Sequence, residues 1–344
     1  MRYWQHIIGV VSLTAGGMLA VASFVFFSDV YGYRKFDGRI FANINPRRYN
    51  AVLARKMDYD SVFLGSSLST NFRCSQLDQL FGCRSMKFAF SGAWLRHSAF
   101  MLDYCSKYRR LKMVVMDFEP LLMVPMQDEF PFDLYHAKNM PIANYFSFDE
   151  LKPALQKLLR PGTIRKVSRD GYASWSHRLE IGRSGIVKEL LAMTARQPEQ
   201  RDNKRQYRTA FDEFERYLLP ALERHSDVKV LLFFPPRSIM SYSPVSIDDY
   251  CRLKLHVVEK LLSLPNVEIF DFQTAAWVLD LDSYGDTWHY KAAVNDWMLE
   301  KMKAGEYRLT AENYSAKCQE LVTLVRNYDY KKAYRELGLP EDLF

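Results

Sequence analysis

The sequence lacks the residue patterns that hold most metals and nucleotides. None of its five cysteines forms a C-x-x-C pair, so a structural zinc site has no ligands at the usual spacing. There is also no zinc-finger spacing, no glycine-rich phosphate loop and no aromatic RNA-binding motif. We therefore expect neither a metal nor a cofactor.

A large excess of one charge is also missing. The chain has 47 Lys and Arg against 40 Asp and Glu, a net charge of +7. This balance disfavours a cationic partner and suits an anionic lipid surface, a polyanionic glycan or a nucleic acid. Without a nucleic-acid motif we expect no nucleic-acid partner. A cytosol-facing nucleic-acid-binding protein remains an alternative, and it predicts DNA affinity that falls steeply with salt.

Cysteines are few, and their number is odd. Cys74 and Cys83 could form a disulfide if the domain lies outside the cytosol, and at least one thiol would then be left over. The sequence does not decide whether this pair is bridged.

Long hydrophobic runs are absent except for one near the N-terminus. Residues 7–27, "IIGVVSLTAGGMLAVASFVFF", are uncharged and match the roughly 20 residues that cross a hydrocarbon core. Phe24, Phe26 and Phe27 follow the small residues, which favours an uncleaved anchor over a cleaved signal peptide. We predict an N-terminal membrane anchor over residues 1–29 and one domain over residues 30–344. Basic residues on the two sides of the run do not fix its orientation.

Beyond residue 58, short strand-like runs alternate with longer amphipathic stretches. Helical spacing is clearest in residues 93–108, 207–225, 248–263 and 290–303. Alternation of this kind favours a parallel sheet covered on both faces. We predict an α/β fold, a three-layer flavodoxin-like sandwich with a five-stranded parallel sheet, preceded by one N-terminal transmembrane helix. The strand candidates are "SVFLG", "SMKFAF", "KMVVMDF", "VKVLLFF" and "VEIFDF", starting at residues 61, 85, 112, 228 and 267.

A long interruption at about residues 120–206 separates the third strand from the fourth. We interpret it as a basic insertion in which arginines and a lysine interleave with Tyr172 and Trp175. Such a surface suits an acidic sugar polymer or lipid headgroups, whereas the simpler alternative is an ordinary solvated insertion. Its basic residues are Arg160, Arg165, Lys166, Arg169, Arg178 and Arg183.

Ligands of parallel sheets bind at the carboxyl ends of the strands, so the residues after each run are the places to search. "FLGSSLST", residues 63–70, puts Ser67 just after the first strand, and "SYGDTWHY" puts Asp286 and His289 after the last. A serine becomes a nucleophile when a histidine removes its proton and a third group orients that histidine. Taken alone, the serine segment and the segment with Asp286 and His289 are each also typical of a capped helix start. Their order along the chain, with the serine after the first strand and the Asp-His pair after the last, favours catalysis.

This order resembles the SGNH (GDSL) serine hydrolases. "FLGSSLST" is similar to the first block of that family, with Ser67 in the nucleophile position and Ser66 in place of its usual aspartate. "FAFSGAW" resembles the second block, whose Gly92 gives a backbone N–H to the oxyanion together with that of Ser67, and "GDTWHY" resembles the last. The Gly-Ser-Ser form looks closer to the membrane-anchored envelope-acylation branch, DltD-like or similar to the alginate-acetylation proteins.

One block departs from the family pattern. Where the family has Gly-x-Asn-Asp, this chain has "MDFEP", so the asparagine that completes the oxyanion hole is missing. Arg237, after the fourth strand, is one candidate to reach the substrate instead. Asp117 and Glu119 in this block could also be a glycosidase pair, but carboxylates satisfied by helix N-termini or backbone turns fit their two-residue spacing better.

The resemblance implies a membrane-anchored serine esterase or O-acyltransferase acting on a cell-envelope polysaccharide. It implies a bacterial inner-membrane location with the domain facing the periplasm or exterior, a polysaccharide acceptor and a membrane-bound acyl-donor protein. The alternative is a catalytically degenerate relative that binds glycan or assembles a complex. The predicted site comprises Ser67, Asp286 and His289 for catalysis, Ser67 and Gly92 for the oxyanion, and Arg237, Trp175 and Tyr172 for the substrate.

Overall fold

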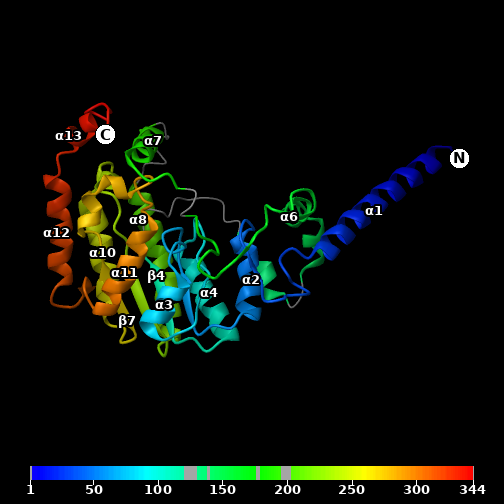
Figure 1. The fold of residues 1–344 in the computed structure, drawn as a ribbon, viewed down its shortest axis with the longest axis horizontal. Helices are drawn as coiled ribbons and strands as arrows, with labels where there is room; N and C mark the ends of the chain where they lie inside the picture. Colours follow the sequence, from blue (N-terminus) through cyan, green and yellow to red (C-terminus); the bar gives the residue numbers. More distant parts are fainter. Residues whose placement is uncertain (1, 120–129, 138–139, 176–178, 195–202, 344) are drawn as a thin grey trace. The chain divides into compact units, whose positions relative to one another are not determined.

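The computed structural model describes residues 2–119, 130–137, 140–175, 179–194 and 203–343 (Figure 1). The chain forms two compact units, Met1–Met57 with Glu129–Ser168, and Asp58–Asp128 with Arg169–Phe344. The predicted insertion at 120–206 is thus divided between the two units, and most of its first half groups with the N-terminal residues. The predicted boundary after residue 29 stays a prediction.

The first unit contains a single long apolar helix and several short elements. Helix α1 (Arg2–Ser28) carries no acidic residue in its first turn and no basic residue in its last. Its residues Tyr3–Ser28 are long and apolar enough to cross a membrane, and only 6% of the most apolar window is buried. An N-terminal signal sequence has the same length and composition. The other elements are β1 (Ile40–Phe41), α2 (Pro46–Lys56), α5 (Phe132–His136), η2 (Ile142–Phe146), α6 (Phe148–Leu159) and β5 (Lys166–Val167).

Local contacts explain why this unit is compact. Strands β1 and β5 pair antiparallel. Arg55 of α2 donates to the carbonyl oxygens of Leu134, Tyr135 and Ala137, which satisfies the end of α5. The buried guanidinium of Arg48 pairs with the buried Glu150 carboxylate at 3.0 Å.

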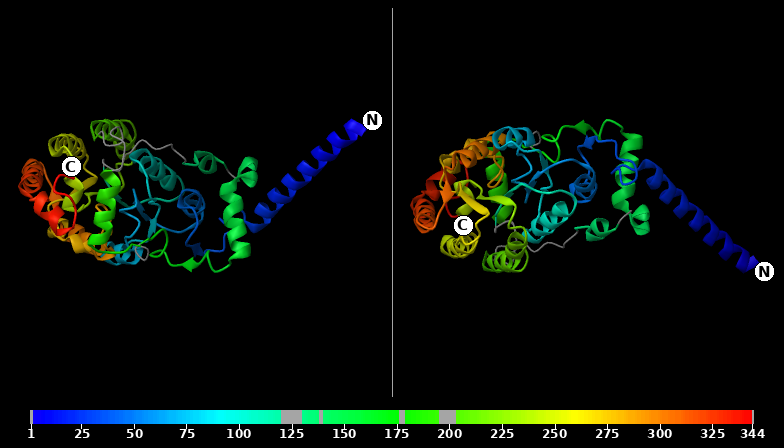
Figure 2. Two further views of the ribbon diagram at one scale, coloured as in Figure 1. Left: turned by 90° about the horizontal axis from the view of Figure 1, so that it is seen from above. Right: turned by 90° about the horizontal axis from the view of Figure 1, so that it is seen from below.

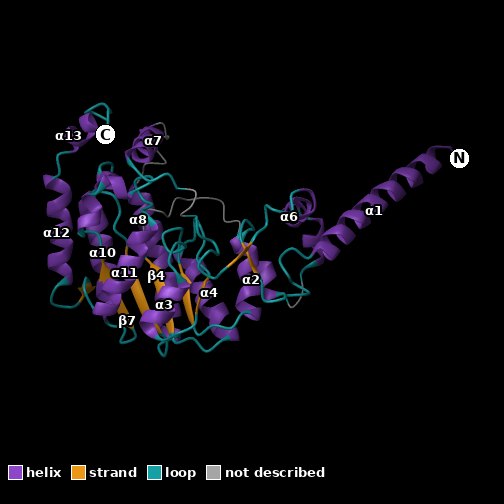
Figure 3. Cartoon of the chain, in the orientation of Figure 1, coloured by secondary structure: helices purple, strands orange, loops and turns teal. Residues whose placement is uncertain are grey.

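The second unit is a mixed α/β structure around a mostly parallel sheet, and helices flank its strands (Figure 3). The sheet has six strands in the order β3-β2-β4-β6-β7-β8. Five are the predicted ones, and they pair in parallel: β2 (Ser61–Leu64), β3 (Ser85–Lys87), β4 (Met113–Asp117), β6 (Lys229–Phe234) and β7 (Val267–Asp271). Most of their residues are buried, as expected for a parallel sheet covered on both faces.

The predicted number of strands was wrong by one. Strand β8 (Arg308–Leu309) adds to the β7 edge antiparallel, after the last predicted helix. A strand of only two residues is too short to show the alternating pattern of a β-strand, so the sequence carried no signal for it.

The helices predicted from their spacing are present. They are α4 (Leu95–Tyr108), α10 (Ile247–Leu262) and α11 (Ala292–Ala304), while the predicted 207–225 helix is α8 (Asn203–Glu213), a π-helical turn η5 (Phe214–Leu218) and α9 (Leu219–Arg224). The remaining elements are α3 (Cys74–Phe81), α7 (Arg183–Thr194), η6 (Ile239–Tyr242), η7 (Ala276–Leu279), η8 (Leu281–Ser283), α12 (Tyr314–Asn327) and α13 (Tyr330–Glu336).

Candidate active site

Ser67 lies on a tight turn that begins where β2 ends. Gly65 has φ of +109°, and a Cβ atom there would lie 2.1 Å from Oδ1 of Asp117, so only glycine fits. The turn closes through Ser69 N–H to Ser66 O at 3.1 Å and Thr70 N–H to Ser67 O at 3.3 Å. Ser67 is thereby held at the carboxyl edge of the sheet with 8% of its surface exposed.

Asp286 and His289 lie on a closed loop after β7. Tyr284 and Tyr290 form a β-bridge at its base, and Gly285 N–H donates to His289 O at 2.9 Å. Both tyrosines are buried, and the Tyr284 hydroxyl donates to Pro236 O at 2.6 Å. The loop is therefore anchored to the end of β6 by its buried base.

The three side chains form a continuous hydrogen-bonded chain. Oγ of Ser67 lies 2.8 Å from Nε2 of His289, and Nδ1 of His289 lies 2.7 Å from Oδ2 of Asp286. A carboxylate only accepts, so Nδ1 carries the hydrogen and Nε2 is left to accept the serine proton. The structure thus brings together residues that are 222 positions apart in the sequence.

Asp286 is held in its charged form. Burial, the largest influence, acts to raise its pKa, but hydrogen bonds from His289 and from the backbone N–H of Trp288 outweigh it. The net result is a pKa below the usual range of an aspartate. Oδ1 accepts from the backbone N–H groups of Trp288 and His289, each at 2.7 Å, which fixes the carboxylate for His289.

Trp175 packs directly against this chain. Its indole N–H donates to Ser67 O at 3.1 Å, and its ring meets the His289 ring edge-on with centroids 4.7 Å apart. Its backbone N–H donates to the Asn71 side chain at 3.1 Å. The sequence predicted Trp175 as a substrate contact. In the structure its side chain contacts both Ser67 and His289 and so helps to fix their positions.

Two backbone donors stand at neighbouring strand ends. Phe90 N–H donates to Gly65 O at 3.1 Å, which ties the segment after β3 to the Ser67 turn, and Gly92 follows with φ of +70°. In the part of the chain that the structure describes, the N–H groups of Ser67 and Gly92 donate no hydrogen bond. They are the pair that the sequence predicted for an oxyanion, and this role stays a prediction.

The "MDFEP" block supports the nucleophile turn. Asp117, at the end of β4, accepts from the backbone N–H of Ser66 at 2.8 Å and from its hydroxyl at 2.7 Å, and also from the Ser69 hydroxyl. Burial raises its pKa, and these hydrogen bonds offset only part of the rise. The sequence pattern placed Asp117 at a strand end but gave no sign that its carboxylate would bind the serine turn.

A buried lysine supports the same turn from β3. Lys87 donates from Nζ to the carbonyl oxygens of Thr70 at 2.8 Å and Asp170 at 2.6 Å. Burial lowers the pKa of Lys87 to about 8. Nothing in the sequence pattern indicated this contact, because Lys87 sits inside an apolar run.

Two of the predicted substrate contacts are buried side chains. Arg237 has no exposed surface; its Nε lies 3.2 Å from Oε2 of Glu119, and its guanidinium faces the Trp288 ring at 4.7 Å. Tyr172 is 1% exposed and belongs to the core. Neither side chain reaches the surface, and the predicted contact of these two residues with substrate stays a prediction. Of the predicted basic surface, Arg169 and Arg183 pair with Asp78 and Asp282, and Arg178 lies outside the described residues.

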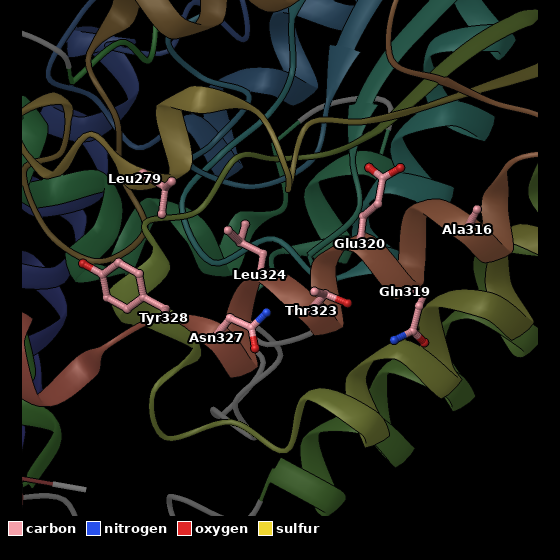
Figure 4. Close-up of a pocket in the computed structure, with 8 residues that line it drawn as sticks. All are labelled: Leu279, Ala316, Gln319, Glu320, Thr323, Leu324, Asn327 and Tyr328. Carbon is pink, nitrogen blue, oxygen red and sulfur yellow. The ribbon is translucent and has the colours of Figure 1, made fainter.

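Other groups that could bind a ligand are separate from these residues. All five cysteines are free, so Cys74 and Cys83 are not bridged. No group of three His, Cys, Asp or Glu side chains that could hold a metal ion occurs among the described residues. A hollow of about 740 Å³ lies along α12, with Leu279 opposite Leu324 and Tyr328 (Figure 4), but no residue of the Ser67 site lines it.

Comparisons with models of known protein families and with curated proteins found no match. A serine hydroxyl bonded to Nε2 of a histidine whose Nδ1 is bonded to a fixed carboxylate can be activated as a nucleophile. This combination suits acyl transfer.

Proposed function

We propose that the protein is a membrane-anchored serine esterase or O-acyltransferase of the SGNH (GDSL) type, acting on a cell-envelope polysaccharide. The observation that carries the proposal is the bonded chain from Ser67 through His289 to Asp286, at 2.8 and 2.7 Å. The order of the five parallel strands supports a flavodoxin-like three-layer assignment, in which sites form at the carboxyl ends of strands.

In the first half-reaction Nε2 of His289 takes the hydroxyl proton while Oγ of Ser67 attacks the carbonyl carbon of an acyl ester. The backbone N–H groups of Ser67 and Gly92 donate to the resulting oxyanion. His289 then returns the proton to the departing alcohol as its C–O bond breaks, and the acyl group stays on Ser67. Asp286 stabilises the imidazolium between these two steps.

In the second half-reaction an incoming hydroxyl attacks the acyl-serine. His289 removes its proton, the tetrahedral intermediate collapses, and Oγ of Ser67 leaves with the proton from His289. Water as the incoming group gives hydrolysis, and a sugar hydroxyl gives transfer. The apolar helix α1 and the net positive charge support transfer from a membrane-bound acyl donor to an anionic envelope polymer.

One observation favours a second candidate, a degenerate relative that binds glycan or assembles a complex without turnover. The family asparagine is missing, and the Asp117 carboxylate binds Ser66 and Ser69 and so cannot replace it as a donor. Loss of one oxyanion donor costs about 3–4 kcal/mol of transition-state stabilisation. Slow turnover is therefore compatible with the enzyme, whereas absence of an acyl-serine is not.

The test uses the full chain in detergent with a fluorophosphonate probe and with a chromogenic acetyl ester. We expect labelling and ester cleavage that fall by at least about a thousandfold in Ser67→Ala and His289→Ala. Ser263→Ala, an exposed serine at the end of α10, is the matched control and should label like the native chain. Folding of each variant is checked by circular dichroism. Folded native protein that is not labelled would favour the binding protein.

Transfer and orientation need separate measurements. Transfer predicts that adding an acetyl acceptor polysaccharide raises the rate of acyl-serine breakdown and yields the acylated polymer, while hydrolysis predicts free acid alone. A periplasmic reporter fused after residue 344 should be active in bacterial cells. Activity of a cytosolic reporter at the same position would instead favour the cytosol-facing alternative.

A further inference from the structure

Helix α6 has an exposed apolar face on the side opposite to its packed face. Pro153 and Ala154 are buried, whereas Phe148, Leu158 and Leu159 are 70%, 63% and 72% exposed. Residues 148, 155 and 159 point in nearly the same direction on a helix with 3.6 residues per turn. A surface helix of a water-soluble domain normally turns its polar side outward, so this helix has the reverse pattern.

The preceding 3-10 helix η2 extends the same kind of surface. Ile142 is 78% exposed, and Phe146 is also exposed. We call the combined surface the α6 apolar face. It consists of Ile142, Phe146, Phe148, Leu155, Leu158 and Leu159. Exposed apolar side chains gathered on one short segment mark a site of interaction with a protein or a membrane.

This segment is fastened to the end of the apolar helix α1. Nζ of Lys157 donates to Ser28 O at 3.0 Å, and the Tyr145 ring packs against Phe26 with centroids 5.7 Å apart. Figure 2 shows α6 beside the last turns of α1 in both views. A helix of 27 residues is about 40 Å long and exceeds the roughly 30 Å of hydrocarbon, so its end reaches the headgroup region.

Basic groups lie around the junction, beside the acidic Asp29 and Asp149. Lys152, Lys157 and Arg160 are exposed on or just after α6. Arg34 donates to Phe26 O and stacks on the Phe26 ring at 3.7 Å. Arg34 and Lys157 thus satisfy carbonyl oxygens in the last turn of α1 while placing positive charge at the level where anionic headgroups lie.

We propose that the α6 apolar face lies in the anionic phospholipid surface of the bilayer that α1 spans. The apolar side chains enter the boundary between headgroups and acyl chains, and the neighbouring lysines and arginines contact lipid phosphates. The occupant is lipid, because the face is continuous with α1 and bordered by basic residues. The proposal rests on membrane insertion of α1 and not on the chemistry of Ser67.

The test places a photo-crosslinking amino acid, p-benzoylphenylalanine, at single positions of the full chain in vesicles of phosphatidylcholine and phosphatidylglycerol. Leu158 and Phe148 are the test positions, so one of them still reports if the other disturbs folding. Leu13, 81% exposed on α1, is the positive control. Leu191, 47% exposed on α7 of the second unit, is the matched apolar control.

After irradiation, phospholipid adducts are measured by mass spectrometry. We expect adducts at Leu158 and Phe148 at least about tenfold above those at Leu191, and fewer in vesicles of phosphatidylcholine alone. Crosslinks between two copies of the chain at these positions, without lipid, would make the face a protein interface and overturn the proposal. Lipid adducts at Leu13 alone would overturn it as well, and so would their absence at Leu13, since α1 would then not be in the bilayer.

Discussion

Asp117 accepts two hydrogen bonds from one residue, Ser66, from its backbone N–H at 2.8 Å and from its hydroxyl at 2.7 Å. Because Ser66 directly precedes the proposed nucleophile, the end of β4 fixes the turn that presents Ser67. The turn itself carries no carboxylate, and the carboxylate that contacts it comes from the neighbouring strand β4. The site depends on this contact for its geometry.

Asp117→Asn should weaken this support. In the native chain the Asp117 carboxylate accepts from the backbone N–H and hydroxyl of Ser66 and from the hydroxyl of Ser69. An asparagine side chain has one oxygen that accepts and one NH2 group that only donates, so at least one of these buried hydrogen bonds is lost. We expect a loss of about 1–3 kcal/mol in the free energy of unfolding. Labelling of Ser67 should also slow, because its turn is less well fixed. Asp296→Asn, which removes a partly exposed partner of Arg73, is the control and should leave the labelling rate unchanged.

Gly65 provides a sharper test of the same contact. Its φ is positive, and a Cβ atom would meet the Asp117 carboxylate at 2.1 Å. Gly82, at the end of α3, has φ of +65°, but a Cβ atom there would meet only open space. Gly82→Ala should cost about 1–2 kcal/mol from backbone strain alone, and Gly65→Ala should cost distinctly more and abolish labelling. Equal melting temperatures of the two variants would contradict the argument.

The two aspartates of the site should respond to pH in opposite directions. The pKa of Asp286 is lowered in the folded state, so its contribution to stability is present above the unfolded value of about 3.9 and is lost as the pH falls through the folded pKa. The pKa of Asp117 is raised, so its contribution is present below the unfolded value and is lost as the pH rises through the folded pKa. Melting temperatures measured against pH therefore distinguish them.

The comparison is made against the asparagine variants. From acid towards neutral pH, the stability of the native chain relative to Asp286→Asn should rise, and its stability relative to Asp117→Asn should fall. The same slope for both variants would show that at least one of the assigned environments is wrong.

Much of the architecture could be predicted because the responsible patterns are local. The five parallel strands are apolar runs, and the glycine and serines after β2 and the D-x-x-H after β7 stand at strand ends, where a sheet gathers them. The sequence could not show that Arg237 would be buried against Glu119 and Trp288. It could not show either that Asp117 would bind Ser66, because such partners meet only after the strands align. Two-residue strand β8 and the division of residues 120–206 between two units also depend on tertiary contacts alone.

Cys251 and Cys318 provide a final test, which depends on the compartment. The thiol of each lies 3.8 Å from the backbone carbonyl oxygen of the other, and both are buried where α10 packs on α12. We expect mild oxidation of the full chain, with diamide taking up the two hydrogens, to join this pair and leave Cys74 and Cys83 as thiols. A disulfide typically adds about 2–4 kcal/mol of stability.

Peptide mapping identifies the joined cysteines, and Cys251→Ser is the control. A Cys74–Cys83 bridge would contradict the packing of Cys251 against Cys318. In bacterial cells, an exported domain should carry the Cys251–Cys318 bond and a cytosolic one should not.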